Sequence, residues 1–324
     1  MIREYSSYGL KHLLISNDKV EAVFLPQLGS KMISLINKKS GTQFLLENQD
    51  KNKIYRKAFH GADYSLYDAS GFDECFPTIE AAEIIIEHIG NGNKKLQYPD
   101  HGELWSKEWD YELTDTSIFF YADGVNAGYS FRKIITLEEN RVIINYSLVN
   151  KSAFPLYYIW SGHPLLAIEE GDRIIMPPGI HKLFLNWTSD DNIGEFGHYI
   201  PWSGEAGEAN SFYDVKSADT GMALKGFTDS LRHGFAGLFR SHKNESVLIS
   251  FDYKKLPYLG VWLCFGGWPA GAVKKHYTVA LEPTTGRPDS LSESVKRNEC
   301  SVLDINEERN WKIEFSLWEG LPQI

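Results

Sequence analysis

Several common signals are scarce in this chain of 324 residues, and each absence argues against a class of protein. The three cysteines, Cys75, Cys264 and Cys300, are widely spaced and form no Cys-x-x-Cys motif, so a disulfide framework or a zinc knuckle is not expected. No apolar run approaches the length of a membrane span. The first residues also lack the apolar stretch of a signal peptide. We therefore expect a cytoplasmic protein with no membrane partner.

Basic clusters and cofactor motifs are missing as well. The formal net charge is −10 and there is no block of lysine and arginine, so nucleic acid is not an expected partner. The histidines show no metal-binding spacing, and no glycine-rich loop opens a helix. The sequence thus predicts neither a metal nor a cofactor. It leaves the assembly open, with a homodimer as one alternative.

Aromatic residues, in contrast, are abundant. They make up 14% of the chain, with 9 Trp and 17 Tyr. Two explanations are open: a large β-core, or a site that stacks flat ligands such as sugar rings.

The apolar pattern predicts an all-β protein. Residues 141–150 and 311–318 alternate cleanly between apolar and polar side chains, as in strands with one buried face. Further strands are predicted at 20–25, 31–36, 117–121, 129–137, 156–160, 234–240, 246–253, 258–265 and 277–282. Loops are expected at 48–70, 89–100 and 187–226, and one short helix at 289–297, capped by Asp289 or Ser290. Without repeats or linkers, this favours a single domain over 1–324, built as a large antiparallel β-sandwich.

Three short motifs carry residues suited to acid–base chemistry. They are His101 in Pro-Asp-His-Gly-Glu-Leu-Trp, His163 in Trp-Ser-Gly-His-Pro, and Glu282 in Ala-Leu-Glu-Pro-Thr-Thr-Gly. Glu282 is predicted to end its strand because Pro283 has no N–H for a ladder, and a rigidly held carboxylate suits a general base. A histidine can give and take protons near neutral pH. Each also has a structural reading: a rim salt bridge for Glu282, a turn cap for His101, and a hydrogen-bonded structural residue for His163.

With these motifs, the chain resembles the galactose mutarotase-like superfamily, the aldose 1-epimerases and their relatives. The resemblance starts at the turn 25–32, includes Gly-Phe-Asp-Glu-Cys-Phe-Pro at 71–77, and covers most of the chain. It implies a β-sandwich that binds a sugar on the concave face of one sheet and interconverts its α and β anomers without a metal. By the same resemblance Glu282 is the general base, His163 the general acid and His101 a supporting histidine. Galactose mutarotases usually carry an asparagine where Gly162 stands, and Arg56 is not firmly matched to their substrate-orienting arginine.

Other residues are candidates for contacts with a sugar. Asp73 and Glu74 could accept hydrogen bonds from hydroxyl groups, or could simply form a turn. His276 lies six residues before Glu282 on the same strand face and could line the cleft. Four tryptophans could stack on a ring, although most tryptophans of a β-sandwich belong to its core. These are Trp105, Trp160, Trp262 and Trp268.

Three functions remain open at this point. The first is an aldose 1-epimerase acting on a free sugar, with that small molecule as its partner. The second is a carbohydrate-binding protein without catalysis, because a fold does not guarantee its activity. The third is an epimerase for a phosphorylated or otherwise charged sugar, which needs two or three cations in the cleft. The cations near the motifs form no compact cluster in the sequence: Lys107, Lys274, Lys275 and Arg287.

Overall fold

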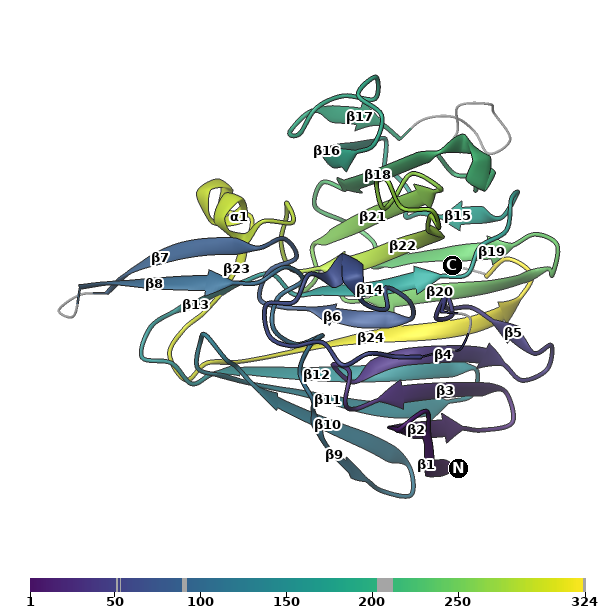
Figure 1. The fold of residues 1–324 in the computed structure, drawn as a ribbon, viewed down its shortest axis with the longest axis horizontal. Helices are drawn as coiled ribbons and strands as arrows, with labels where there is room; N and C mark the ends of the chain where they lie inside the picture. Colours follow the sequence, from purple (N-terminus) through teal and green to yellow (C-terminus); the bar gives the residue numbers. More distant parts are fainter. Residues whose placement is uncertain (51, 53, 89–91, 203–211, 323–324) are drawn as a thin grey trace.

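Two large antiparallel sheets dominate the computed structural model (Figure 1). The structure describes residues 1–322 except 51, 53, 89–91 and 203–211. The first sheet has twelve strands in the order β1-β2-β3-β4-β6-β14-β22-β21-β18-β16-β17, with β5 paired to β4. The second has eight strands in the order β15-β19-β20-β24-β12-β11-β10-β9. The predicted β class with large antiparallel sheets is therefore confirmed.

The bounds of the elements are as follows. The twelve-stranded sheet holds β1 (Ile2–Ser7), β2 (Leu10–Ser16), β3 (Val20–Leu25), β4 (Lys31–Asn37), β5 (Thr42–Gln43), β6 (Phe72–Cys75), β14 (Ser161–Leu166), β16 (Lys182–Thr188), β17 (Tyr199–Pro201), β18 (Met222–Phe227), β21 (Tyr258–Phe265) and β22 (Tyr277–Thr284). The eight-stranded sheet holds β9 (Asp110–Leu113), β10 (Ser117–Asp123), β11 (Tyr129–Glu138), β12 (Arg141–Asn150), β15 (Arg173–Ile175), β19 (Phe235–Arg240), β20 (Glu245–Phe251) and β24 (Glu308–Glu319). Two small ribbons pair β7 (Ala82–His88) with β8 (Gly92–Tyr98), and β13 (Leu156–Tyr158) with β23 (Ser301–Leu303). The helical elements are η1 (Tyr64–Leu66), η2 (Ala218–Thr220) and α1 (Leu291–Arg297).

The core forms because alternate residues of both large sheets point toward each other. On β24, Trp311, Ile313 and Phe315 are buried, and on β22 the inward residues are Val279 and Leu281. These side chains belong to one continuous apolar cluster that includes residues of both large sheets. The opposite face of the twelve-stranded sheet is thereby left to carry a site. None of the described helices is long and apolar enough to span a membrane.

Three expectations about local structure were wrong. β22 continues beyond Glu282. Pro283 fits within the strand because Leu259, the residue opposite, makes both of its backbone hydrogen bonds to Thr228 instead. The predicted loop 187–226 contains β17 and β18, although 203–211 lie outside the described residues. The predicted loop 89–100 contains β8, a polar strand whose alternation is hidden because most of its side chains are exposed.

One ion pair is buried in the interior between the sheets. Lys133 Nζ lies 3.0 Å from Glu74 Oε1, and both side chains are 0% exposed. The Tyr146 hydroxyl and the Trp160 indole N–H also donate to Glu74. Burial lowers the pKa of Lys133, although Glu74 opposes this. Both oxygens of the Glu74 carboxylate are therefore hydrogen-bonded, which is the condition for a buried charge to be tolerated.

Lys133→Met is expected to lower the free energy of unfolding by about 3–5 kcal/mol, because it leaves the Glu74 carboxylate buried without its cation. Urea denaturation of the purified variant measures this. The matched control is Lys95→Met, whose ammonium pairs with Glu83 at the surface. That variant should cost at most about 1 kcal/mol. Equal losses for the two variants would contradict a structural role for the buried pair.

Candidate active site

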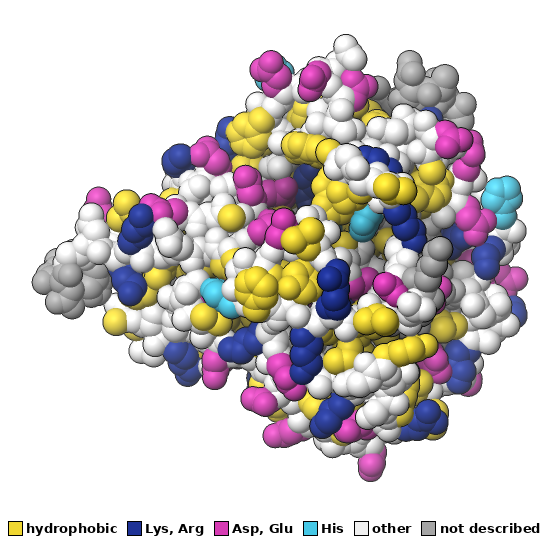
Figure 2. All heavy atoms as spheres, in the orientation of Figure 1, with side chains coloured by type: hydrophobic (Ala, Val, Ile, Leu, Met, Phe, Trp, Pro, Cys, Tyr) yellow, Lys and Arg dark blue, Asp and Glu magenta, His cyan; other side chains and the backbone are white. Residues whose placement is uncertain are grey.

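A pocket of about 550 Å³ opens on the outer face of the twelve-stranded sheet. In Figure 2, acidic and apolar side chains meet around a hollow in the upper half of the face that is shown. The described residues that line the pocket are Tyr64, Ala69, Ile79, Glu80, Asp100, His101, His163, Leu165, Asn186, Trp187, Phe196, Lys225, Trp262, Trp268, His276 and Asp289. The volume lies within the range of typical small-molecule sites, roughly 300–1,000 Å³.

His163 and Glu282 come from neighbouring strands at the base of this pocket. On β14, Ser161, His163 and Leu165 alternate outward, and on the adjacent β22 Ala280 and Glu282 do the same. His163 Nδ1 lies 3.0 Å from Glu282 Oε1. The histidine lines the pocket, so its other ring nitrogen, Nε2, is the one left for a ligand.

Glu282 itself lies beneath the pocket and is 0% exposed. Its Oε2 accepts hydrogen bonds from Lys225 Nζ at 2.5 Å and from the Ser161 hydroxyl at 3.3 Å. Burial alone would raise the pKa of Glu282, but Lys225 and His163 outweigh it and hold the pKa well below its ordinary value. The carboxylate is therefore ionised at neutral pH. Its Oε1 contacts His163, and its Oε2 contacts Lys225 and Ser161.

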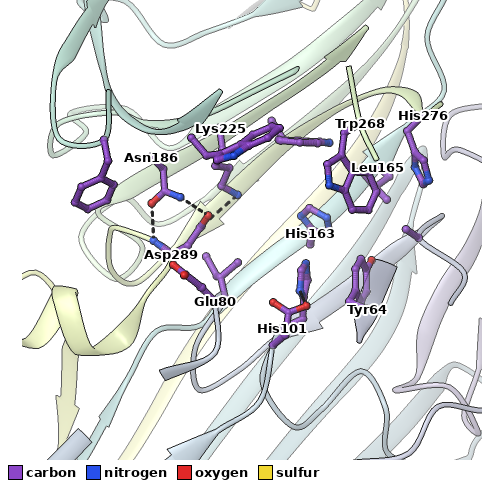
Figure 3. Close-up of a pocket in the computed structure, with 16 residues that line it drawn as sticks. Tyr64, Glu80, His101, His163, Leu165, Asn186, Lys225, Trp268, His276 and Asp289 are labelled. Carbon is purple, nitrogen blue, oxygen red and sulfur yellow. Dashed lines mark hydrogen bonds and ion pairs between the residues drawn. The ribbon is translucent and has the colours of Figure 1, made fainter. Parts of the chain in front are cut away.

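Lys225 joins two carboxylates. It extends from β18, two strands from β22, and its Nζ also lies 3.6 Å from Asp289 Oδ1. Burial disfavours the charged amine, but Asp289 and Glu282 outweigh this and raise the pKa of Lys225. Lys225 is thus a fixed positive charge at the edge of the pocket (Figure 3).

Asp289 is held between β22 and α1 by a two-point contact with Asn186 on β16. The Asn186 amide donates to Asp289 Oδ2 at 2.8 Å, and the Asp289 backbone N–H donates to Asn186 Oδ1 at 3.1 Å. Burial raises the pKa of Asp289 to about 6, although Lys225 opposes the shift. Asp289 was expected only as a cap of the short helix, but Ser290 holds the N-cap position.

His101 reaches the pocket from the loop after β8. Its backbone has a φ of 58°, which is uncommon for a residue with a Cβ atom. The ring stacks on Tyr64 with centroids 3.8 Å apart, and Nδ1 lies 3.0 Å from Asp100 Oδ2. The rings of His101 and His163 are 5.8 Å apart between centroids. The structure thus brings His101, His163 and Glu282 together, as expected, while their chemical roles stay predictions.

Aromatic side chains form another part of the wall. Trp262 on β21 meets Trp268 edge to face at 6.1 Å, and Trp268 packs on His276 at 4.8 Å. Burial lowers the pKa of His276, which favours the neutral ring. Trp105 is not part of this wall: it is buried, packs edge-on against Tyr64 and donates to the Asp100 carbonyl. Of the predicted sugar contacts, Trp262, Trp268 and His276 line the pocket and Trp105 supports it indirectly.

Two predicted sugar contacts, Glu74 and Trp160, lie in the interior instead. Glu74 is on the inward face of β6, bound to Lys133, and Trp160 donates to it. Both side chains are 0% exposed, so the interpretation of these two as sugar contacts was wrong. Asp73 points to the pocket side, but its carboxylate accepts from the Tyr64 hydroxyl and pairs with Lys31. It therefore supports Tyr64 below the pocket surface.

The structure also locates Gly162 and Arg56, the two positions at which the sequence does not clearly match the galactose mutarotases. A Cβ atom on Gly162 would lie 3.0 Å from the Phe72 ring, in the interior of the sandwich. The Arg56 side chain donates to the Leu66 carbonyl and lies against Tyr67. Neither residue is among the described residues that line the pocket.

Sequence reasoning missed most of the other residues that line the pocket. The polar ones are Tyr64, Glu80, Asp100, Asn186, Lys225 and Asp289. A usable signal existed for Lys225, since Met-Ala-Leu-Lys-Gly-Phe at 222–227 is a short apolar run with a single charge. No comparable signal marks Tyr64 or Asn186. Across the described residues there is also no cluster of three or more metal-binding side chains suited to an ion.

Comparison with known proteins gives matches at the level of structure. No protein-family model matches the chain, and no curated protein does. A galactose mutarotase-like protein from Clostridium acetobutylicum superposes with a TM-score of 0.70 at 16% identity, covering 98% of each chain. A galactose mutarotase related enzyme from Lactobacillus acidophilus gives 0.67 at 16% identity over 99% of each chain. A galactose mutarotase-like protein from Lactobacillus casei gives 0.65 at 14% identity, over 95% of this chain and 100% of the other. The chain therefore has the galactose mutarotase-like fold.

Proposed function

We propose that this protein is an aldose 1-epimerase that interconverts the α and β anomers of a free, uncharged monosaccharide. The observation that carries the proposal is His163, which lines a sugar-sized pocket while its Nδ1 lies against the buried carboxylate of Glu282. The names of the solved structures with this fold support the same activity.

The chemistry requires two proton transfers. To open a cyclic hemiacetal, one group takes the proton of the C1 hydroxyl and another gives a proton to the ring oxygen, as the bond between C1 and that oxygen breaks. The open aldehyde rotates about C1–C2 and closes on its other face, with the two roles reversed. His163 suits the second task, because Glu282 holds its ring through Nδ1 and leaves Nε2 for the ring oxygen.

The lining of the pocket suits a sugar. Trp187, Trp262 and Trp268 supply flat apolar surfaces for the C–H face of a ring. Glu80, Asp100 and Asp289 supply carboxylates that can accept hydrogen bonds from hydroxyl groups. An apolar wall with a few placed polar groups is the usual form of a small-molecule site.

The lysine and arginine side chains considered as partners of a sugar phosphate all bind other groups of the protein. Lys107, Lys274 and Lys275 each donate to a backbone carbonyl. Arg287 pairs with Glu299 and Asp229. None of these four is among the described residues that line the pocket, and Lys225, which does line it, is paired with two carboxylates. This arrangement favours an uncharged sugar over a phosphorylated one.

Polarimetry on freshly dissolved α-glucose, α-galactose and α-glucose 6-phosphate tests the proposal, with the spontaneous rate subtracted. We expect the protein to accelerate at least one of the free sugars. Its kcat/KM for the phosphorylated sugar should be lower by roughly tenfold or more, because the phosphate group would lie near carboxylates of like charge without a compensating cation. Faster turnover of the phosphorylated sugar would contradict this choice of substrate. A protein that binds the free sugars without accelerating their equilibration would be a binding module.

A further inference from the structure

We propose that the pocket holds a second sugar-binding subsite, built around Trp187, and that the protein takes reducing disaccharides as well as monosaccharides. The inference rests on the proposed function and extends its substrate class. The unit with the free anomeric carbon lies over His163 and Glu282, and the second unit lies toward β16. Ring opening of the first unit is the step described above. The bond between the two units neither forms nor breaks, and no further reactant is needed.

The floor of the pocket is longer than one sugar ring. Residues paired across five neighbouring strands form a single row from β14 to β16: Leu165, Ala280, Trp262, Lys225 and Trp187. All of them except Ala280 line the pocket. Because neighbouring strands lie about 4.7–4.9 Å apart, the row is about 19 Å long. A pyranose ring is about as wide as an aromatic ring, so one unit over His163 leaves much of this floor uncovered.

A β-bulge turns Trp187 toward the pocket. On β16, Leu185 is paired with Gly226 of β18, and the register then shifts so that Trp187 is paired with Lys225. Asn186 is the extra residue of the bulge. In a regular strand Asn186 and Trp187 would point to opposite faces of the sheet, whereas here both line the pocket. Bulges often redirect a side chain in this way beside a functional site.

The β16 end of the pocket presents exposed aromatic surface. Trp187 is 40% exposed, and Phe196, on the loop between β16 and β17, is 50% exposed. The rings of Trp187 and Trp262 lie 5.8 Å apart between centroids, with their planes at 32°. The two indoles therefore extend one aromatic surface from β21 to β16. Exposed apolar side chains gathered at one pocket are typical of a binding site, and the C–H face of a second sugar ring fits such a surface.

Polar groups for the hydroxyl groups of that ring stand beside the aromatic surface. Figure 3 shows Asn186, Asp289 and Lys225 gathered to one side of His163. The Asn186 amide donates to Asp289 Oδ2, whereas Asp289 Oδ1 has no hydrogen-bond partner within the described residues. A sugar hydroxyl would supply the missing donor. Because Lys225 is already paired with Glu282 and Asp289, this end of the pocket favours an uncharged second unit.

The chemistry at the first unit sets the direction of the second. Its C1 and ring oxygen face His163 and Glu282, so the oxygen at C4, on the opposite side of the ring, points away from them. Toward β6, His163 is flanked by the stacked rings of Tyr64 and His101. The row of paired residues continues instead toward β16. A unit linked to C4 would therefore reach Trp187.

Polarimetry on freshly dissolved lactose, maltose and cellobiose tests the proposal, since each carries a second unit on C4 of glucose. Each is compared with glucose, and 4-linked galactobiose is compared with galactose. The second unit is bound equally before and during ring opening, so it should lower KM and leave kcat nearly unchanged. We expect kcat/KM for at least one disaccharide to exceed that of its own monosaccharide by roughly 3- to 10-fold, as for one stacked ring. If no disaccharide exceeded its monosaccharide, the proposal would be overturned.

Trp187→Ala should bring kcat/KM for the preferred disaccharide down to that for its monosaccharide, mainly through a higher KM. The matched control is Trp318→Ala, because Trp318 is 38% exposed and lies on β24 of the other large sheet. It should keep the wild-type ratio of the two kcat/KM values. Phe196→Ala, on a loop, should lower the ratio too and replaces Trp187→Ala if that variant does not fold. A wild-type ratio in the folded variant would overturn the subsite.

Calorimetric titration separates this subsite from the proposed function. Tighter binding of a disaccharide than of its monosaccharide, lost in Trp187→Ala, would support the subsite whether or not ring opening is accelerated. Such binding without acceleration of any sugar would contradict the proposed function alone. Accelerated ring opening with no preference for any disaccharide would leave the proposed function intact and overturn the subsite.

Discussion

His163→Asn is expected to lower kcat/KM for anomer interconversion by roughly 10²–10⁴-fold, the usual contribution of one general acid. Asparagine retains a polar side chain but cannot carry a proton to the ring oxygen at neutral pH. It also removes the partner of Glu282 Oε1. The variant should still bind the sugar, since the aromatic wall and the acidic side chains are unchanged.

Polarimetry and calorimetric titration with the same sugar separate these two effects. His242→Asn is the matched control, because His242 is exposed on the turn between β19 and β20. It should leave kcat/KM unchanged. If His163→Asn turned over the sugar within a few-fold of the wild type, His163 could not be the proton donor, and the acid would have to be sought at His101.

Glu282→Gln is expected to affect both rate and stability. Glutamine keeps the size of the side chain but removes the charge that orients His163 and compensates Lys225. We expect mutarotation to slow by about 100-fold or more, comparable to the loss of a catalytic proton-transfer group. Because Lys225 would keep only Asp289 as a carboxylate partner, the free energy of unfolding should fall by about 3–5 kcal/mol.

The pH dependence of stability gives a second readout of Glu282. The pKa of this carboxyl is lowered in the folded state, so its contribution is fully present above the unfolded pKa of about 4.3 and is lost as the pH falls below it. Urea denaturation at pH 7 and pH 3 should therefore show a smaller difference for Glu282→Gln than for the wild type, because most of the loss occurs well below the unfolded pKa. Equal differences would show that the carboxylate does not stabilise the fold.

The sequence predicted the parts of the site that are written in short motifs. His101, His163 and Glu282 each sit beside glycine or proline at a strand or turn, and their local context was enough to expect them together. Strands such as β12 and β24 were also predictable, because apolar residues recur at every second position of their sequences. Such local patterns can be recognised from a single sequence.

Other parts of the site depend on which face of a strand is inward. Asp73 and Glu74 are adjacent in β6, yet one supports the pocket and the other pairs with Lys133 in the interior. The same choice places Trp160 in the core and Trp262 in the pocket. Every residue of β6 is buried, so no polar alternation reveals the faces in advance.

Lys225 and Asp289 were missed for a different reason. Lys225 contacts Glu282 because β18, β21 and β22 are neighbours in the sheet, although 57 residues separate the two in the chain, and Lys225 in turn contacts Asp289. Asn186, on the next strand, is 103 residues from Asp289. Local sequence patterns do not predict which distant strands become neighbours in a sheet. The charged residues that these strands bring together could therefore be identified only from the structure.

Exchange between anomers at equilibrium is the most direct measure of the central claim, that this pocket catalyses ring opening of a free sugar. It is followed by ¹³C NMR magnetisation transfer on sugar labelled at C1, with and without the wild-type protein. We predict faster transfer between the α and β signals of at least one free hexose, with no new signal from change at another carbon. Transfer rates equal to the spontaneous rates for glucose, galactose and other free hexoses, measured with a protein shown to bind them, would contradict it.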